Sequence, residues 1–491
     1  MDGGTSTSEV DEDHGPLSGR PWLASYAPEV PPEVEVLAES LTEMLAASAE
    51  RYGDRVALDF FGAEMTYTEL LDTVTRAAES LRAAGVRAGD RVALVLPNCP
   101  QHVVAFYAAL RLGAIVVEHN PLYPAGELEH QMADCGAQVV VARDKTEDVI
   151  EGHSSQTAVA ANLAPALHAA LPWSQSLALR VPVATPPAPP TPTPRRVADR
   201  ALSWERVSSS TGPLESGYPQ PHPEDVALLQ YTGGTTGTPK GAVLSHGNLR
   251  ANAAQGRAWM PGLKDGEETV YAVLPLFHAY GLTLCLTFSM SVGATLVLLP
   301  RFDLDQMFEA IRRRPPTFLP AVPPIYERLA AAAIDRGVDL SSIRYAISGA
   351  MALPPAVVEA WESVTGGLLV EGYGMTETSP VALGNPAAPP PRPGTGAVPV
   401  PATALRSAPP DQPPHGQPRA AQRPPPRPPS RNPADAALPP AVLKKRDALE
   451  LAILQLRDRK LTLPRDEYLQ ELERLLVELA ELNEATGGSK E

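Results

Sequence analysis

The stretch from Tyr231 to Leu249, YTGGTTGTPKGAVLSHGNL, concentrates residue types that bind a chain of phosphates. Glycines let backbone N–H groups turn toward an anion, threonine hydroxyls add donors, and a lysine adds positive charge. A Walker P-loop is excluded, because Pro239 precedes the lysine and Gly241 follows it. A purely structural Gly/Thr turn is the alternative. The candidate phosphate ligands are Thr232, Gly233, Gly234, Thr235, Thr236, Gly237, Thr238 and Lys240.

A second candidate lies in the segment from Val270 to Pro300, which has no Lys, Arg, Asp or Glu and is long enough to cross a membrane. Pro275, Gly281 and Gly293 interrupt the segment. We therefore interpret it as a buried strand, a polar turn, a buried helix and a second buried strand. His278 falls in the turn, where a histidine taken alone is more often a core residue than a site residue.

Helical and strand patterns alternate around these candidates. Apolar residues spaced three or four apart predict helices in LTEMLAASAERYG and YTELLDTVTRAAESLRAAGV. Short, continuously apolar stretches, RVALVLP and AQVVVAR, predict buried strands, and the same alternation returns after residue 225. The pattern predicts an α/β fold with two units, in which largely parallel sheets are covered by helices on both faces.

The phosphate-binding stretch closely resembles the signature of the adenylate-forming (AMP-binding) family of acyl-CoA synthetases, luciferases and peptide-synthetase adenylation domains. The resemblance continues, in the correct order, through LPLFHAYGL, VPPIYERL, AISGAMALP and EGYGMTETSP. It covers roughly residues 36–385 and is strongest for ligases that join fatty acids to coenzyme A. It implies a large N-terminal domain made of two α/β subdomains and an incomplete β-barrel.

The resemblance also implies roles for individual residues. Lys240, His278, Thr376 and Glu377 are expected to be catalytic, with Glu377 as the Mg²⁺ ligand. Small residues let the backbone approach a planar ligand, and a tyrosine ring offers a face for adenine. For Gly349 and Ala350, a plain strand-end turn is the alternative. The residues expected to contact the adenine or acyl group are His278, Gly349, Ala350, Glu371, Gly372, Tyr373 and Gly374.

The implied reaction uses ATP, Mg²⁺ and coenzyme A. A carboxylate oxygen attacks the α-phosphorus of ATP, pyrophosphate leaves, and the resulting acyl-AMP reacts with coenzyme A. Both first reactants are anionic, so catalysis must come from positioning and charge neutralisation. Between Val270 and Pro300 there is no acidic residue to pair with the ammonium group of an amino acid. A medium- or long-chain fatty acid is therefore the first expectation for the substrate, and an aryl acid is the second.

Composition narrows the partners and the compartment. The formal net charge of −16 argues against nucleic acid or an anionic membrane surface as the main ligand. Cys99, Cys135 and Cys285 are far apart and form no CxxC pair, so neither a disulfide framework nor a zinc site is expected. The acidic N-terminus contains no apolar signal region. A cytoplasmic protein without a transmembrane segment is the prediction.

The chain divides by composition. Residues 1–30 are predicted to be a disordered tail and residues 31–385 the AMP-binding domain, with a proline-rich loop at 181–196. Residues 386–440 contain 20 prolines in 55 positions and are predicted to be a disordered linker. Residues 441–486 carry a leucine stripe, which predicts a helical hairpin or coiled-coil tail capable of self-association.

The resemblance ends in the linker. No Thr-Gly-Asp motif follows, and the lysines near the C-terminus lie on a helical tail unlike the lid domain of the family. The loss of a charge-stabilising lysine and of a closing lid predicts an enzyme that adenylates slowly and completes acyl-CoA synthesis poorly. Two alternatives stay open: a non-catalytic nucleotide- or acyl-binding scaffold that uses the tail, and a frame-shifted gene product.

Overall fold

The computed structural model describes most of the first 401 residues and three positions near the C-terminus. The described ranges are 20–123, 125–137, 139–143, 157–161, 202–203, 212–232, 239–386 and 398–401. The chain forms two compact units, Met1–Arg406 and Ser407–Glu491. The predicted loop at 181–196 lies outside the described residues, as do residues 1–19 of the predicted tail and nearly all of the linker at 386–440. Residues 20–30, also predicted to be disordered, are described: they contain a short 3₁₀-helix and pack Ala27 and Val30 against Trp259.

The second unit is described at Glu471, Arg474 and Glu478, all of which are helical. The Arg474 guanidinium lies 2.7 Å from the Glu471 carboxylate and 3.4 Å from that of Glu478. These are the i,i+3 and i,i+4 spacings of neighbours on a helix surface. The rest of the predicted helical tail at 441–486 lies outside the described residues.

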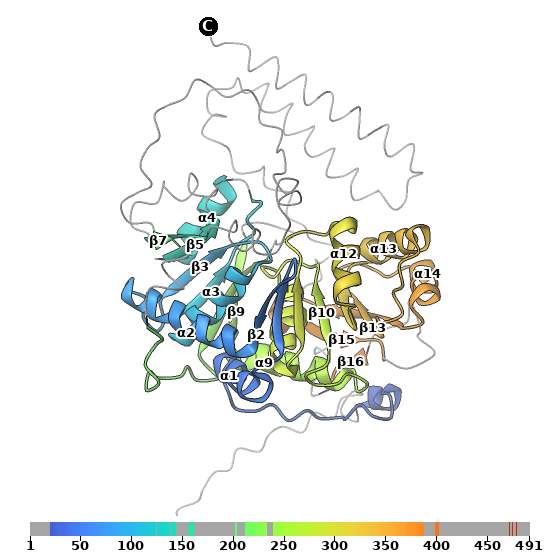
Figure 1. Cartoon of the computed structure of the whole chain (residues 1–491), viewed down its shortest axis with the longest axis horizontal. Coiled ribbons are helices and arrows are strands. Elements are labelled where there is room, and N and C mark those ends of the chain that lie inside the picture. Colours follow the sequence, from blue (N-terminus) through green and yellow to red (C-terminus); the bar gives the residue numbers. More distant parts are fainter. Residues whose placement is uncertain are drawn as a thin grey trace, which may run out of the picture. The chain divides into compact units, whose positions relative to one another are not determined.

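Two twisted sheets organise the first unit (Figure 1). Their central strands are parallel. Antiparallel strands form both edges of the nine-stranded sheet and one edge of the seven-stranded sheet, whose other edge strand is parallel. In spatial order, the nine-stranded sheet contains β16 (Val398–Pro399), β15 (Val381–Gly384), β14 (Leu368–Gly374), β13 (Tyr345–Ser348), β12 (Phe318–Ala321), β10 (Thr269–Ala272), β11 (Thr295–Leu298), β1 (Val56–Phe60) and β2 (Ala63–Thr66). The seven-stranded sheet contains β7 (Leu202–Ser203), β6 (Thr157–Ala161), β5 (Val139–Arg143), β3 (Arg91–Val95), β4 (Ile115–Glu118), β8 (Val226–Thr232) and β9 (Lys240–Ser245).

Helices cover both faces of each sheet, because neighbouring strand residues point to opposite sides and both sides are apolar. One large core contains residues of both sheets together with α1 (Leu41–Tyr52), α2 (Tyr67–Ala83), α3 (Pro100–Arg111), α9 (His246–Trp259) and α11 (Phe288–Val292). The outer face of the nine-stranded sheet packs on α12 (Leu304–Arg313), α13 (Pro323–Arg336) and α14 (Pro355–Thr365). The outer face of the seven-stranded sheet packs on α4 (Ala125–Cys135). The predicted α/β fold of two subdomains is confirmed.

Local sequence explains where several helices begin. At α1, Ser40 and Glu43 form a reciprocal capping box, and Thr66 and Glu69 do the same for α2. Each box satisfies two backbone N–H groups that the first helical turn leaves without partners. The short η1 (Pro21–Ser25) begins instead with a proline, which has no N–H group to satisfy.

The uncharged segment from Val270 to Pro300 folds as predicted. It contains β10, the short helix α10 (Ala279–Gly281), the π-helical segment η3 (Leu282–Thr287), α11 and β11. Both strands are wholly buried. Within the part of the chain that the structure describes, no helix is long and apolar enough to cross a membrane.

The predicted domain boundary at residue 385 needs a correction. β16 pairs with β15, where Leu383 is opposite Pro399 and Gly384 is opposite Val398. Val400 is buried against Trp259, and the Gln255 side chain donates a hydrogen bond to the Pro401 carbonyl oxygen at 3.0 Å. Residues 398–401 are therefore ordered despite the surrounding prolines. A proline at an edge position is compatible with pairing because it can still accept hydrogen bonds.

Candidate functional site

The predicted site residues follow the ends of parallel strands. β13 ends at Ser348, which is followed by Gly349 and Ala350, and the neighbouring strand β14 contributes Glu371 opposite Ser348. β10 leads into the turn that carries His278. In sheets of this kind ligands bind beyond the carboxyl ends of the strands. The fold thus brings three of the predicted motifs to one edge of the nine-stranded sheet.

The phosphate-binding stretch begins and ends on a strand pair. Thr232 closes β8, Lys240 opens β9, and the two residues are paired in register. The Thr232 hydroxyl donates a hydrogen bond to the Lys240 carbonyl oxygen at 3.3 Å. Gly233 to Thr238 lie outside the described residues. The Lys240 side chain is exposed, and no described residue pairs with its ammonium group.

Glu377 lies in the short 3₁₀-helix η4 (Thr376–Thr378), next to β9. The Thr378 hydroxyl fixes this turn by accepting from the Met375 N–H at 3.1 Å. The Thr283 hydroxyl of the π-helical segment donates to the Ser379 carbonyl oxygen at 2.9 Å. The Glu377 carboxylate is exposed and has no partner among the described side chains. Lys240 and Glu377 therefore belong to neighbouring segments, and both keep their charged groups available.

His278 occupies the N-cap position of α10 and is exposed to solvent. Its ring lies 4.8 Å from that of Phe277, centroid to centroid. Desolvation by the surrounding protein lowers the pKa of His278. The lowered pKa favours the neutral imidazole at neutral pH, which does not repel a cation and can accept or donate a hydrogen bond.

Gly349 lies against Tyr280. A Cβ atom at position 349 would stand 3.0 Å from the Tyr280 ring, so a larger residue would displace that ring. The Tyr280 hydroxyl donates to the Ala321 and Ile347 carbonyl oxygens at 3.1 and 2.5 Å, which fixes the ring across the ends of β12 and β13. Ala350 has a positive φ of 65°. This tight, small-residue turn is suited to close approach of a planar ligand.

The motif at the end of β14 divides into a structural and an accessible part. Glu371 accepts a hydrogen bond from the Leu353 N–H at 3.0 Å, which holds the turn after β13. A Cβ at Gly374 would lie 2.0 Å from the Pro380 carbonyl oxygen, so only glycine fits there. Gly372 adjoins Ile347. Tyr373 is 56% exposed, which leaves a ring face open for stacking.

Two polar residues that the sequence motifs did not single out join the two sheets. Asn98, after β3, donates to the Ala272 and Leu274 carbonyl oxygens at 2.9 and 2.8 Å and accepts from the Leu276 N–H at 2.8 Å. Gln230, in β8, donates to the Phe277 carbonyl oxygen at 2.8 Å. The only sequence signal for them was their place, a polar residue within an apolar strand or shortly after one.

A buried histidine lies below the phosphate-binding stretch. His119, directly after β4, stacks on Tyr231 with ring centroids 5.8 Å apart. Its Nδ1 atom is 2.9 Å from the Gln131 Oε1 atom. Desolvation lowers the pKa of His119 to about 4. The histidine is therefore a neutral, structural neighbour of the site.

The site offers one carboxylate to a metal. Among the described residues there is no group of three or more His, Cys, Asp or Glu side chains that could hold a metal ion. Mg²⁺ is commonly held by one or two carboxylates together with substrate phosphates and water. The exposed carboxylate of Glu377 beside the phosphate-binding stretch fits that donor set.

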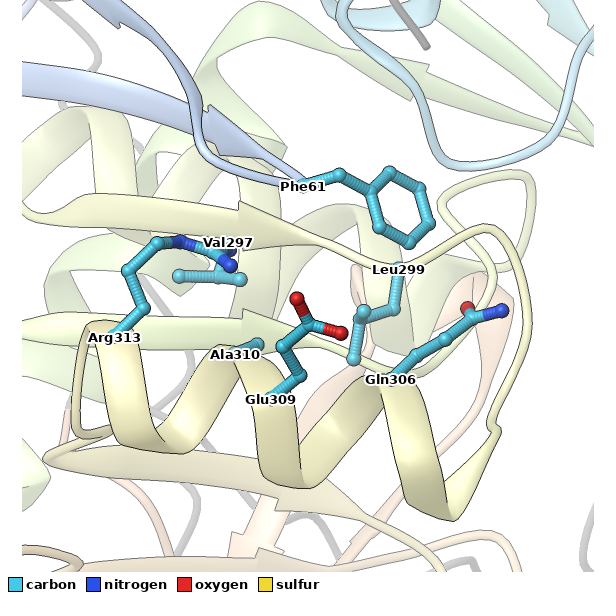
Figure 2. Close-up of a pocket in the computed structure, with 7 residues that line it drawn as sticks. All are labelled: Phe61, Val297, Leu299, Gln306, Glu309, Ala310 and Arg313. Carbon is cyan, nitrogen blue, oxygen red and sulfur yellow. The ribbon is translucent and has the colours of Figure 1, made fainter. Parts of the chain in front are cut away.

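A small recess lies away from these residues (Figure 2). It has a volume of about 10 Å³. Its lining comes from α12, from the strand β11 and the residue after it, and from the turn that contains Phe61. A space of this size holds about one water molecule. The recess is therefore no substrate site.

The first unit is an α/β domain whose predicted motifs lie at or beyond the ends of its strands. The sequence profile of the family described as AMP-binding enzyme matches residues 45–417, and the chain belongs to this family. The prediction from the sequence motifs is thereby confirmed.

Individual relatives agree with this assignment. The chain is 36% identical to a long-chain-fatty-acid–CoA ligase of Bacillus subtilis, over 75% of this chain and 65% of that protein. It is 34% identical to a long-chain-fatty-acid–CoA ligase of Yersinia pestis, over 78% of this chain and 69% of that protein. The chain thus spans about two thirds of the length of the relatives it matches.

A solved structure shares the fold. An anthranilate CoA ligase in complex with anthranoyl-AMP superposes with a TM-score of 0.62 at 26% identity. The match covers 74% of this chain and 65% of that protein.

Proposed function

We propose that this chain activates an apolar carboxylic acid with ATP, forming acyl-AMP and pyrophosphate. One observation carries the proposal. The base of the phosphate-binding stretch lies beside the turn that holds Glu377, and neither Lys240 nor Glu377 has a charged partner among the described residues. A cation and a metal-binding carboxylate in neighbouring segments are what a polyphosphate substrate requires.

The side chains divide the work of the first step. A carboxylate oxygen attacks the α-phosphorus, the bond from that phosphorus to the bridging oxygen breaks, and pyrophosphate leaves. Lys240 offsets the charge of the phosphates, and the Thr376 hydroxyl is available to the α-phosphate. Mg²⁺, held by Glu377 and phosphate oxygens, would neutralise charge that the protein alone leaves uncompensated. His278, whose pKa is lowered by desolvation, is available to orient the acid as a neutral hydrogen-bonding group.

We propose a medium- or long-chain fatty acid as the substrate. The segment that follows His278, up to Pro300, contains no Lys, Arg, Asp or Glu. Leu282, Leu286 and Phe288 within it are fully buried. The two ligases of Bacillus and Yersinia act, by their names, on long-chain fatty acids. An aryl acid is the second candidate, favoured by the structural likeness to the anthranilate ligase.

Thioester formation with coenzyme A is the second half of the proposed reaction, and we expect it to be slow in this chain. The family match ends at residue 417, and the sequence after it lacks the lid motifs named above. Closure of a lid is a common requirement for the second step of a two-step reaction. We therefore propose that adenylation outpaces thioester formation.

The test is ATP–pyrophosphate exchange measured with the purified chain and a series of acids. Exchange that rises with fatty acids of medium or long chain supports the proposal, and exchange that rises with benzoate-type acids favours the aryl alternative. ATP binding without acid-dependent exchange would instead support the scaffold role. Thioester yield, followed in the same samples after coenzyme A is added, reports the second step separately.

A further inference from the structure

Gln230 connects the two halves of the site through one side chain. The residue lies in β8 of the seven-stranded sheet, two positions before Thr232, where the phosphate-binding stretch begins. Its Nε2 atom donates a hydrogen bond of 2.8 Å to the Phe277 carbonyl oxygen, in the turn after β10 of the nine-stranded sheet. That carbonyl belongs to the peptide group whose nitrogen is that of His278.

The turn that receives this bond is also held from its other end. Asn98 makes three hydrogen bonds to residues 272, 274 and 276, so the chain is fixed up to the position before Phe277. The bond from Gln230 fixes the next peptide, directly at His278. The His278 N–H also donates to the Pro275 carbonyl oxygen at 3.2 Å, but that bond lies within the turn, so Gln230 supplies the described side-chain bond that ties this peptide to β8 and the phosphate-binding stretch.

Gln230 carries a cost that packing alone would not explain. The residue is 2% exposed, and its Oε1 atom is buried without a hydrogen-bond partner among the described residues. An apolar side chain of the same length would fill the space without burying an unsatisfied acceptor. Residues that break a rule of stable folding, such as a buried polar atom without a partner, are expected mainly at functional sites.

We propose that Gln230 is a positioning residue for adenylation, which sets the distance between the bound phosphates and the carboxylate held near His278. The inference rests on the proposed function, because it assigns the two halves of the site to the two reactants. In-line attack requires the reacting atoms at a defined separation, and displacement by about 1 Å can cost roughly 100-fold in rate. Loss of the bond should therefore lower turnover more than it weakens the binding of either substrate.

The first experiment is steady-state ATP–pyrophosphate exchange by Gln230→Met, which keeps the length of the side chain and removes its donor. We expect kcat to fall at least about tenfold, while KM for ATP and for the fatty acid changes less than about threefold. The thermal midpoint should stay close to that of the unmodified chain. Gln230→Asn, which keeps the amide but is too short to reach Phe277, should behave alike and serves if the methionine variant folds poorly.

The matched control is Gln255→Met. Gln255 also donates from its side chain to a backbone carbonyl, that of Pro401 at 3.0 Å, and accepts from the Asn252 side chain at 2.9 Å, with no described hydrogen bond to the turn that carries His278. Its kcat should stay within about twofold of the unmodified chain. Equal losses in both variants, or a loss confined to KM, would overturn the proposal and leave Gln230 as an ordinary packing residue.

A ligand-free measurement separates this inference from the proposed function. Hydrogen–deuterium exchange of the backbone over residues 274–282 should be faster in Gln230→Met than in the unmodified chain, and unchanged in Gln255→Met. If the unmodified chain shows no pyrophosphate exchange, the proposed function fails, while this measurement still decides whether Gln230 holds the His278 turn. Unchanged deuterium uptake over 274–282 would overturn the inference whatever the activity.

Discussion

The two halves of the site differ in how much of their geometry is fixed without a ligand. On the acyl side, the turn from Ala272 to His278 is held by Asn98 and Gln230, and the Tyr280 ring is fixed by two backbone carbonyls. On the nucleotide side, Lys240 and Glu377 are exposed and have no partners among the described residues. Under the proposed function, the acid would meet a prepared surface, whereas the nucleotide and its metal would supply the charges that complete their own half.

The largest effect is expected from removing the cation on the nucleotide side. Lys240→Met should lower the rate of ATP–pyrophosphate exchange by roughly 10²–10³-fold, because nothing described nearby replaces that charge. Its thermal midpoint should not fall, since the ammonium group makes no described contact. Lys264→Met, at an exposed lysine 3.9 Å from Glu267, is the control and should leave exchange unchanged. Equal activity in the two variants would remove Lys240 from the site.

On the acyl side the corresponding change should act on stability. Asn98→Ala removes three hydrogen bonds from a buried turn and leaves the Leu274 carbonyl and the Leu276 N–H without partners among the described residues, whereas the Ala272 carbonyl keeps the Leu299 N–H at 3.4 Å. We expect the free energy of unfolding to fall by about 3 kcal/mol, measured by urea denaturation. Asn248→Ala, at an exposed capping position of α9, should cost about 1 kcal/mol or less. Similar losses at the two positions would contradict the account of a braced acyl side.

The buried histidine below the phosphate-binding stretch should make stability depend on pH. The pKa of His119 is about 4 in the folded chain, below the ordinary histidine value near 6.5, because burial disfavours its charged form. The unfolded chain therefore binds more protons, and stability is lost as pH falls from about 6.5 toward 4. At pH 5 this amounts to about 2 kcal/mol relative to pH 7.5.

His119→Gln should flatten that pH dependence by a similar amount, as measured by urea denaturation at pH 7.5 and pH 5. His130→Gln, at an exposed histidine of α4, should leave the slope as it is. Because burial also lowers the pKa of His246 to about 4, part of the slope should remain in His119→Gln, and a slope as steep as that of the unmodified chain would contradict the prediction.

The smallest effect is expected for Glu377, the proposed metal ligand. Glu377→Gln should raise the Mg²⁺ concentration needed for half-maximal exchange by about tenfold, since phosphate oxygens and water still hold most of the ion. Saturating Mg²⁺ should restore a large part of the rate. Glu359→Gln, at an exposed glutamate of α14, is the control. An unchanged Mg²⁺ requirement in Glu377→Gln would place the metal elsewhere.

Much of the fold could be predicted from the sequence because local patterns and tertiary packing agree. The capped helices α1 and α2, and the apolar strands β3 and β5, follow directly from spacing and composition. The segment from Val270 to Pro300 was correctly interpreted because its glycines and proline contradict a membrane span. The strand β16 was missed, because a proline-rich stretch gives no β signal. Its pairing partner β15 lies outside that stretch, so the composition of the linker does not reveal the pair.

The site was less predictable from the sequence than the fold. The motifs pointed to Lys240, His278 and Glu377. The structure places each of these residues at a strand terminus or in the turn that follows one. They gave no sign of Asn98 and Gln230, whose partners are backbone atoms some 174 and 47 positions away along the chain. A hydrogen bond to a distant carbonyl leaves no pattern in spacing or residue type. The hydrogen bonds by which Asn98 and Gln230 join the two sheets are therefore visible only in the folded structure.

Fatty-acid-dependent ATP–pyrophosphate exchange, measured side by side for the unmodified chain and Lys240→Met, tests the central claim most directly. The account predicts exchange that requires both Mg²⁺ and a fatty acid, and that is lost in Lys240→Met while the thermal midpoint is kept. Binding of ATP by the unmodified chain with no acid-dependent exchange would contradict it.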